Sequence, residues 1–281
     1  MTTPPQQPFH CKLCGNERYT IDCSKVLVRA NRCSCFSFCE SCDNKGVIWS
    51  TDENGYSFVS PCLECGSLNT RIQKFNLAEI PSRYFKSETG VTLASYAALY
   101  SDGNNMPIGN LKIVHARLSK WTRAFVPGDT GIILHGEIGT GKTHLMSLIL
   151  RELTLEKGIT CRFIEFSHLL TLLKAQYDRG LGVSQILEKL VNIDVLAIDE
   201  LGKAGRTEWE LSILDELISK RYNRDCSTLF TTNELITPPK NPKMAQETQT
   251  LRERVGNRIF SRLHEMTDFI EVQARDFRKT P

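Results

Sequence analysis

The stretch GEIGTGKT, residues 136–143, constrains the fold of this chain more than any other feature. It fits the pattern G-x-x-x-x-G-K-[ST], with a short apolar run before it and a helical pattern after it. Glycines at these places let the backbone turn its N–H groups around phosphate oxygens, and the start of the next helix adds partial positive charge. A glycine turn that arose by chance would not be expected to have both a strand before it and a helix after it. The stretch therefore predicts a phosphate-binding loop between a strand and a helix.

The chemistry of this loop indicates which residues bind a nucleotide. Lys142 is expected to reach the β- and γ-phosphates, and Thr143 is expected to ligate Mg²⁺. Within the loop, the expected nucleotide contacts are Gly136, Glu137, Ile138, Gly139, Thr140, Gly141, Lys142, Thr143 and His144. ATP with Mg²⁺ is therefore the expected cofactor pair.

Short apolar runs alternate with helical patterns from residue 130 onward. Strands are expected within 130–136, 160–166, 194–200 and 226–234, and helices within 142–158, 167–180, 183–192 and 207–223. A further helix is expected at 110–126, just before Pro127. This alternation is typical of a parallel α/β sheet with helices on its faces.

Carboxylates at the end of the buried run DVLAIDE predict the second half of the nucleotide site. Asp199 would be costly to bury there unless it served a metal, so we expect it to hold Mg²⁺ as a Walker B aspartate does. Neighbouring strand residues point to opposite sides, so Glu200 is expected to polarise the attacking water instead. Asn233, which ends the run TLFTTN, is expected to orient that water or contact the γ-phosphate. Glu200 as a simple strand end and Asn233 as a turn residue are the alternatives.

Cysteines dominate the first 65 residues, which hold nine of the eleven in the chain. This segment has little apolar periodicity, so it needs a metal or covalent link to fold. Because no signal peptide is evident at the start, the chain is expected to be cytoplasmic, where clustered cysteines bind metals more often than they form disulfides. Cys161 and Cys226 are isolated and are expected to be ordinary residues of the larger domain.

Spacing divides the clustered cysteines between two zinc sites. The first predicted set of ligands is Cys11, Cys14, Cys33 and Cys35, and the second is Cys39, Cys42, Cys62 and Cys65. Each set supplies four thiolates for one tetrahedral Zn²⁺, although an iron–sulfur cluster or disulfides could also use such cysteines. Cys23 is left over and could replace a ligand of the first site. Because only three residues separate Cys35 from Cys39, a compact pair of sites is expected.

Charge and hydropathy exclude some classes of function. No apolar run approaches the roughly 20 residues that span a bilayer, so no membrane partner is expected. The first 80 residues carry eight basic and eight acidic side chains. Because each zinc–thiolate site adds a formal charge of about −2, the loaded segment would be acidic. A strongly DNA-binding module is basic, so protein docking or a purely structural role is favoured there. Trp49, Tyr56 and Phe58 are nevertheless candidates for stacking on bases.

The motifs together resemble the AAA+ ATPases. The stretches GIILHGEIGTGKTHL, NIDVLAIDELGKAGRTEWELSILDELISKRYN and TLFTTNEL are similar to the family of DnaC and DnaI helicase loaders and IstB transposition ATPases. The resemblance covers about residues 75–281. It implies an AAA+ core that oligomerises on binding ATP between subunits, acts on DNA with a protein partner, and has no full C-terminal lid.

The resemblance also implies roles for arginines near the end of the chain. RVGNRIFSRLHEM is similar to the arginine-finger helix of the family, so Arg262 is the expected finger and Arg258, four residues earlier, is the second candidate. A solvated basic face is the alternative. ARDFRKT is similar to the closing segment of the family, in which Arg278 would sense the nucleotide of its own subunit.

We therefore expect a zinc-binding domain at residues 1–68, a linker with the first core helices at 69–128, and an AAA+ ATPase core at 129–281. The expected function is that of a DnaC-like loader, which hydrolyses ATP and binds single-stranded DNA and a replicative helicase. A rival expectation is an IstB-like transposition ATPase that acts on duplex DNA with a transposase. A third is an ATP-gated adaptor with little hydrolysis.

Overall fold

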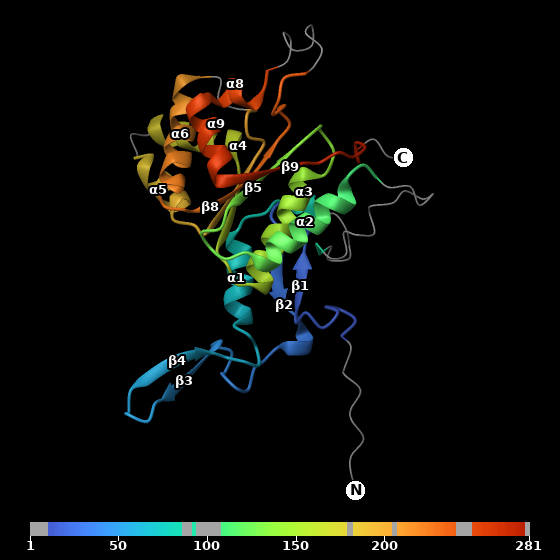
Figure 1. Cartoon of the computed structure of the whole chain (residues 1–281). Helices are drawn as coiled ribbons and strands as arrows, with labels where there is room; N and C mark the ends of the chain where they lie inside the picture. Colours follow the sequence, from blue (N-terminus) through green and yellow to red (C-terminus); the bar gives the residue numbers. More distant parts are fainter. Residues whose placement is uncertain are drawn as a thin grey trace.

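A computed structural model describes residues 11–85, 92–93, 108–178, 182–203, 207–239 and 249–278 (Figure 1). Its centre is a five-stranded sheet with the order β6-β7-β8-β5-β9. The strands are β5 (Gly131–His135), β6 (Cys161–Glu165), β7 (Val195–Asp199), β8 (Ser227–Thr232) and β9 (Thr267–Glu271). All neighbouring pairs are parallel. The predicted parallel α/β sheet is thus confirmed, and β9 is an edge strand that was not predicted from the sequence.

Helices cover both faces of this sheet (Figure 1). They are α1 (Leu68–Leu77), α2 (Leu111–Ala124), α3 (Lys142–Arg151), α4 (Phe166–Asp178), α5 (Ser184–Val191), α6 (Glu208–Tyr222), α8 (Leu251–Val255) and α9 (Asn257–Met266). A π-helical turn, Glu152–Glu156, extends α3 as far as Gly158, whose φ of 67° closes the helix. The predicted helices at 110–126, 142–158, 183–192 and 207–223 are confirmed within a few residues, and the one at 167–180 is confirmed to residue 178, because 179–180 lie outside the described residues.

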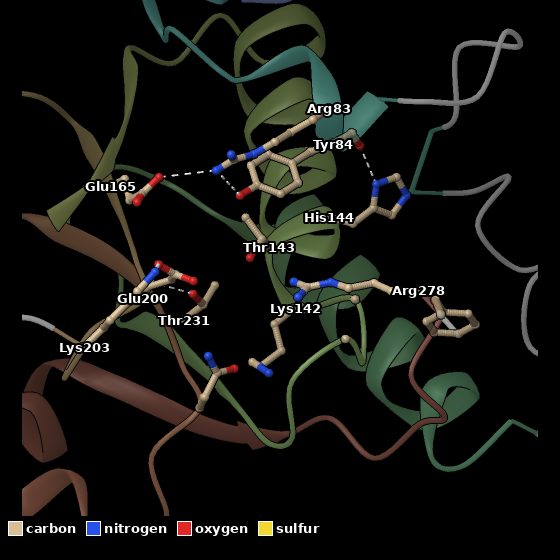
Figure 2. Close-up of a pocket in the computed structure, with 14 residues that line it drawn as sticks. Arg83, Tyr84, Lys142, Thr143, His144, Glu165, Glu200, Lys203, Thr231 and Arg278 are labelled. Carbon is tan, nitrogen blue, oxygen red and sulfur yellow. Dashed lines mark hydrogen bonds and ion pairs between the residues drawn. The ribbon is translucent and has the colours of Figure 1, made fainter. Parts of the chain in front are cut away.

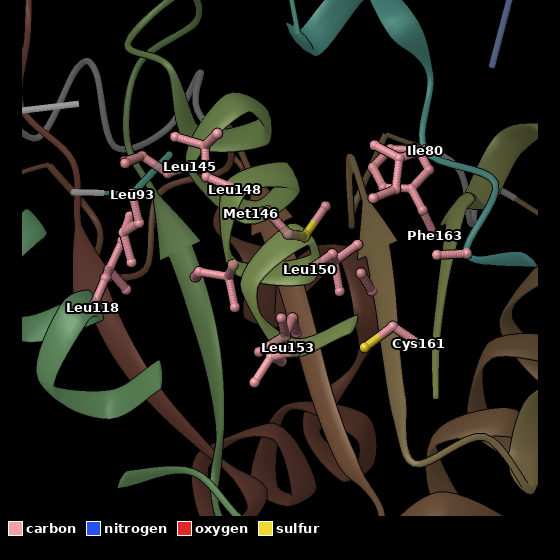
Figure 3. Close-up of a cluster of buried hydrophobic side chains, with 14 of the residues drawn as sticks. Ile80, Leu93, Leu118, Leu145, Met146, Leu148, Leu150, Leu153, Cys161 and Phe163 are labelled. Carbon is pink, nitrogen blue, oxygen red and sulfur yellow. The ribbon is translucent and has the colours of Figure 1, made fainter. Parts of the chain in front are cut away.

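The core has two halves because side chains alternate along each strand. Ile132 and Leu134 of β5 face one half, which they share with residues of α1, α2 and α3, as Figure 3 shows for part of it. Ile133, between them, faces the other half with residues of α4, α5, α6, α8 and α9. The sheet is therefore buried on both faces, as its nearly continuous apolar strands require.

The cysteine-rich segment forms two antiparallel hairpins. One is β1 (Tyr19–Asp22) with β2 (Arg29–Arg32), and the other is β3 (Val47–Thr51) with β4 (Ser57–Pro61). Short 3₁₀ helices, η1 (Ser34–Phe36) and η2 (Ser82–Phe85), follow the first hairpin and α1. The first hairpin lies beside α3, whereas the second projects away from the sheet (Figure 1).

Packing joins the first hairpin to the larger domain. Tyr19, Val28 and Ala30 belong to the same buried cluster as Ile132 and Leu134 of the central sheet. Arg151, at the end of α3, is 1% exposed, and its Nη2 lies 2.8 Å from Glu17 Oε2, just before β1. The first cysteine set is thus connected to the helix that starts at the phosphate loop. In the part of the chain that the structure describes, no helix is long and apolar enough to cross a membrane.

Candidate functional site

A cavity of about 830 Å³ opens where the carboxyl ends of the central strands meet the start of α3 (Figure 2). Its walls come from the phosphate loop, the ends of β6 and β8, the segment after β7, η2 and the C-terminal segment. The lining residues that the sequence predicted are Gly139, Gly141, Lys142, Thr143, His144, Glu200, Asn233 and Arg278. Strands of a parallel sheet deliver polar side chains to one edge, which explains this convergence.

The phosphate loop has the backbone that its glycines allow. Gly139 and Gly141 have φ values of 84° and 90°, which L side chains rarely adopt. A Cβ at Gly139 would also lie 1.8 Å from Asp276 Oδ1. Of the other predicted contacts, Thr140 is buried, with its Oγ1 donating to the Glu137 carbonyl, whereas the side chain of Ile138 is exposed to solvent.

Lys142 is folded back onto its own loop. Its Nζ donates to the carbonyl oxygens of Gly136 at 2.8 Å and Glu137 at 2.6 Å. The side chain is only 5% exposed, and burial lowers the pKa of Lys142 to about 8. A bound phosphate would offer this ammonium a charged acceptor in place of two neutral carbonyls, which is the stronger hydrogen bond.

Thr143 and Asp199 come together as the sequence predicted for a magnesium site. Thr143 Oγ1 donates to Asp199 Oδ1 at 2.9 Å, and Thr231 Oγ1 donates to the same oxygen. Asp199 is 1% exposed, and burial raises the pKa of its carboxyl group. A hydroxyl and a carboxylate at the end of a strand are oxygen ligands that suit Mg²⁺. These two residues would hold the ion, which would neutralise charge on the phosphates.

Glu200 has a different environment from Asp199, although strand alternation is not the reason. β7 ends at Asp199, and Glu200 has a left-handed φ of 57°, so the rule of opposite sides does not apply to it. Its carboxylate lies at the cavity, where Lys203 Nζ is 2.5 Å from Oε2 (Figure 2). Its backbone N–H donates to Thr231 Oγ1 at 3.0 Å. Glu200 is thus a partly exposed carboxylate at the cavity, in contrast to the buried carboxylate of Asp199 beside Thr143.

Six residues that line the cavity were not predicted: Arg83, Tyr84, Glu165, Lys203, Thr231 and Phe277. Arg83 and Tyr84 come from η2, which lies more than fifty residues before the phosphate loop. Tyr84 OH donates to Asp199 Oδ2 at 3.3 Å, and Arg83 Nη2 lies 3.2 Å from Glu165 Oε2. The polar ends of 160–166 and TLFTTN were signals for Glu165 and Thr231, whereas nothing local marked η2.

The C-terminal segment crosses the mouth of the phosphate loop. Val272 N donates to the His135 carbonyl at 2.7 Å, and Phe277 N donates to the Gly139 carbonyl at 3.0 Å. These bonds place Arg278 at the cavity, where its charge contributes to the lowered pKa of Lys142 after the larger effect of burial. The position agrees with a residue that senses nucleotide in its own subunit.

The two finger candidates lie on α9, outside the residues that line the cavity. Arg262 Nη1 is 2.7 Å from Asp215 Oδ1 on α6, and the Arg262 side chain is 19% exposed. Arg258 is 72% exposed, and its Nε lies 3.7 Å from the same oxygen. Neither arginine lines the nucleotide cavity of its own chain in the described residues, so a role at the phosphates would require a neighbouring subunit.

The cysteines gather in the two predicted sets. In each set the four Sγ atoms lie within 4.8 Å of one another. Neighbouring Sγ atoms are 3.7 Å apart in Cys11–Cys33 and 3.6 Å apart in Cys42–Cys65. A tetrahedron with Zn–S bonds of about 2.3 Å has an edge of about 3.8 Å, so these sets fit one zinc ion each. The remaining members, Cys14, Cys35, Cys39 and Cys62, complete the two groups.

Backbone hydrogen bonds favour the thiolate of one cysteine in each set, whereas burial raises the pKa of Cys14, Cys35, Cys39 and Cys65. Hydrogen bonding from the backbone of Cys14 lowers the pKa of Cys11 to about 7, and that of Cys65 lowers the pKa of Cys62 to about 7. Thiolates are the form that binds metal. Cys23 stands apart from both sets, because its Sγ contacts the Phe85 carbonyl oxygen at 3.6 Å. Cys23 as a ligand of the first site is therefore not supported.

A comparison with protein families decides the affiliation of the chain. The family described as IstB-like ATP binding protein matches residues 114–280, more than half of the 281 residues. The chain belongs to this family. The matched range includes the phosphate loop, Asp199, Glu200, Asn233 and the arginines of α9, whereas η2 lies outside it.

Relatives and solved structures agree with this affiliation. The replicative helicase loader DnaC of Escherichia coli strain K12 is 28% identical over 145 residues, which are 51% of this chain and 56% of DnaC. The chain thus spans about half the length of the curated relatives it matches. A crystal structure of the DnaC helicase loader has a TM-score of 0.54 at 24% identity, covering 68% of this chain and 99% of that one. A DnaI structure has a TM-score of 0.50 at 20% identity, covering 70% and 93%. The predicted P-loop AAA+ fold is confirmed.

Proposed function

We propose that this IstB-like protein is an ATPase that loads a replicative helicase onto single-stranded DNA. The observation that carries the proposal is that Lys142, Thr143 and Asp199 lie close together at a cavity that Glu200 also lines. The chain that carries this site is similar to DnaC. Such a site supplies phosphate binding, a place for Mg²⁺ and a general base, which are the parts that ATP hydrolysis requires.

Each residue has a task in the proposed reaction. Lys142 leaves the loop carbonyls to contact the β- and γ-phosphates, and Thr143 and Asp199 hold Mg²⁺. Glu200 accepts the proton of the attacking water, which Asn233 orients from the end of β8. Arg278 contacts the phosphates from the C-terminal segment of the same chain.

The proposed reaction is completed between subunits. Arg258 and Arg262 lie together on α9, away from the cavity of their own chain, and Arg258 is mostly exposed. An arginine from a neighbour would stabilise the charge on the transferred phosphoryl group, which contributes about 10³–10⁵ in rate. ATP would then favour a homo-oligomer, and assembly of the subunits would control the rate of ATP hydrolysis. We propose that the protein acts in the cytoplasm.

The projecting hairpin β3–β4 is the surface proposed to hold the helicase. Trp49, Phe58 and Val59 are 69%, 50% and 45% exposed, because they belong to a sheet of only two strands. The turn between the strands carries Asp52 and Glu53, and no basic residue lies between 46 and 70. An apolar surface with an acidic edge suits a protein with a basic rim better than it suits DNA.

The match to the IstB-like family supports a second candidate, which is an IstB-like ATPase, and we propose duplex DNA and a transposase as its partners. The same nucleotide site would serve either function, because function depends on the partner and not on the fold. A nucleotide-gated adaptor is the third candidate, and it differs by having little hydrolysis.

Two experiments test the proposal. The full chain, immobilised with ATP and Mg²⁺, should retain a hexameric helicase from extract of its own cells, and Trp49→Ser should weaken this retention relative to Tyr177→Ser on α4. Recovery of a transposase instead would favour the second candidate. Glu200→Gln should bind ATP normally but lower turnover by about 10²–10⁴. Unchanged turnover in this variant would mean that Glu200 is not the base.

A further inference from the structure

Tyr84 lies outside the matched family range and contacts Asp199, the carboxylate expected to bind Mg²⁺. Asp199 uses its two oxygens differently. Oδ1 accepts from Thr143 and Thr231, whereas Oδ2 accepts from Tyr84 OH at 3.3 Å. Thr143 is the hydroxyl expected at Mg²⁺, so Tyr84 approaches the carboxylate through the oxygen that does not face Thr143. The tyrosine can therefore remain in place when an ion binds between Thr143 and Asp199.

Contacts on several sides fix the position of Tyr84. Its backbone carbonyl bonds to His144 Nδ1 in the first turn of α3, directly after Thr143 (Figure 2). Its hydroxyl also accepts a hydrogen bond of 2.8 Å from Arg83 Nη2, which in turn pairs with Glu165. Its ring packs on Phe163 of β6 at a centroid distance of 5.9 Å. Side chains held in this way have little freedom, so the hydroxyl is preorganised toward Asp199.

The segment that carries Tyr84 is joined to the first cysteine-rich hairpin. Val28 N donates to the Ile80 carbonyl, and Ser82 N donates to the Val26 carbonyl, both at 2.9 Å. The loop between β1 and β2 is therefore hydrogen-bonded to the residues at the start of η2. A shift of that hairpin would move Tyr84 relative to Asp199, because Tyr84 lies only two residues after Ser82 in the same short helix.

We propose that Tyr84 is a positioning residue of the nucleotide site. Its hydroxyl sets the orientation of the Asp199 carboxylate for Mg²⁺, and η2 transmits the position of the zinc-binding hairpin to that carboxylate. This inference rests on the proposed ATP site and adds to it a residue that lies outside the matched family range. The tyrosine itself contacts neither the ion nor the phosphates.

The test measures the Mg²⁺ requirement of nucleotide binding in the full-length protein. A fluorescent, slowly hydrolysed ATP analogue is titrated against wild type and Tyr84→Phe over a range of Mg²⁺ concentrations and in EDTA. The variant keeps the ring and loses one hydrogen bond to a charged group, so half-maximal binding should need about tenfold more Mg²⁺. Affinity in EDTA should stay unchanged, and the melting temperature without Mg²⁺ should fall by no more than a few degrees, because the lost hydrogen bond also contributes to folding.

Tyr222→Phe is the matched control. Tyr222 also donates its hydroxyl to a carboxylate, that of Glu265, on a surface away from the nucleotide cavity. This control should keep the wild-type Mg²⁺ requirement. In an Asp199→Asn background, Tyr84→Phe should add no further change in Mg²⁺ requirement, because the carboxylate that it positions is already gone.

Different results identify different failures. An unchanged Mg²⁺ requirement in Tyr84→Phe would overturn the positioning role and leave the ATP site intact. A lower requirement would also overturn it, because the tyrosine would then compete with the ion. If wild type failed to bind the analogue at any Mg²⁺ concentration, the proposed ATP site would fall together with the inference.

Discussion

Arg262 Nη1 lies 2.7 Å from Asp215 Oδ1 of its own chain, and this pair separates the two finger candidates. Both side chains of the pair are less than one third exposed, so the contact contributes to the stability of the free subunit. Arg258, four residues earlier, is 72% exposed, and its contact with the same carboxylate is longer, at 3.7 Å. Arg258 can therefore reach a neighbouring subunit without breaking a buried contact.

Alanine variants of the two arginines should differ. Arg262→Ala is expected to lower the free energy of unfolding by about 1 kcal/mol, because it leaves Asp215 without its closest partner. Arg258→Ala should leave stability unchanged and lower ATP turnover of the assembled protein by about 10³. Denaturant unfolding and steady-state turnover at saturating protein measure the two effects. Full turnover in Arg258→Ala, with turnover lost in folded Arg262→Ala, would assign the finger to Arg262.

The ion pair of Lys203 with Glu200 predicts restrained hydrolysis in the free protein. The ammonium is 2.5 Å from Oε2 and occupies one oxygen of the expected general base. Lys203→Met removes this competitor, and because an exposed ion pair contributes up to about 1 kcal/mol, basal turnover should rise by up to about fivefold. Lys220→Met is the control, since Lys220 pairs with Glu216 at 2.7 Å on α6. A fall in turnover would instead indicate that Lys203 contacts the nucleotide.

Local patterns predicted most of the nucleotide site. The phosphate loop and the strand ending at Asp199 are each continuous in sequence, so motif and periodicity were sufficient. The two cysteine sets also followed from spacing alone. β9 was missed because TDFIE is short, begins with polar residues and follows α9 without a turn signal. Its strand character comes from pairing with β5, which no local pattern records.

The contacts of η2 could not be predicted because they join distant parts of the chain. Tyr84 and Asp199 are 115 residues apart, and Arg83 and Glu165 are 82 residues apart. The first hairpin posed the same problem. Its residue Tyr19 is buried in the core of the larger domain, although the cysteine-rich composition of residues 1–68 predicted a separate domain there. Composition shows where the cysteines cluster along the chain, but it does not show which part of the larger domain packs against them.

Nucleotide affinity should depend on pH through Lys142. Burial lowers the pKa of Lys142 to about 8 in the free protein, and phosphates bind the protonated form. Affinity should therefore be flat below pH 8 and fall above it by up to about tenfold per pH unit. Fluorescence titration of an ATP analogue between pH 7 and pH 9.5 in EDTA measures this without Mg²⁺. Constant affinity up to pH 9.5 would show that Lys142 stays charged in the free protein.

The same pKa predicts a small effect of pH on folding. The folded-state pKa of Lys142 lies below its unfolded value, so the unfolded chain binds more protons between about pH 8 and pH 10.5. The contribution of Lys142 to stability should therefore rise with pH across this window. Lys142→Met should remove that rise, as measured by denaturant unfolding at pH 8 and pH 10. A wild-type rise that persists in Lys142→Met would have to come from other groups.

Loss of the two metal sites should have unequal consequences. Cys35→Ser and Cys39→Ser should each lower bound zinc from about two equivalents to about one, because their thiols belong to separate sets. Cys35→Ser should also lower the melting temperature of the ATPase core by about 5 °C, because the first set adjoins β1 and the Arg151–Glu17 pair. Cys39→Ser should spare the core, since β3–β4 projects away from it. Cys226→Ser, with zinc and melting temperature both unchanged, is the control. Loss of both ions from either variant would show that the sites are interdependent.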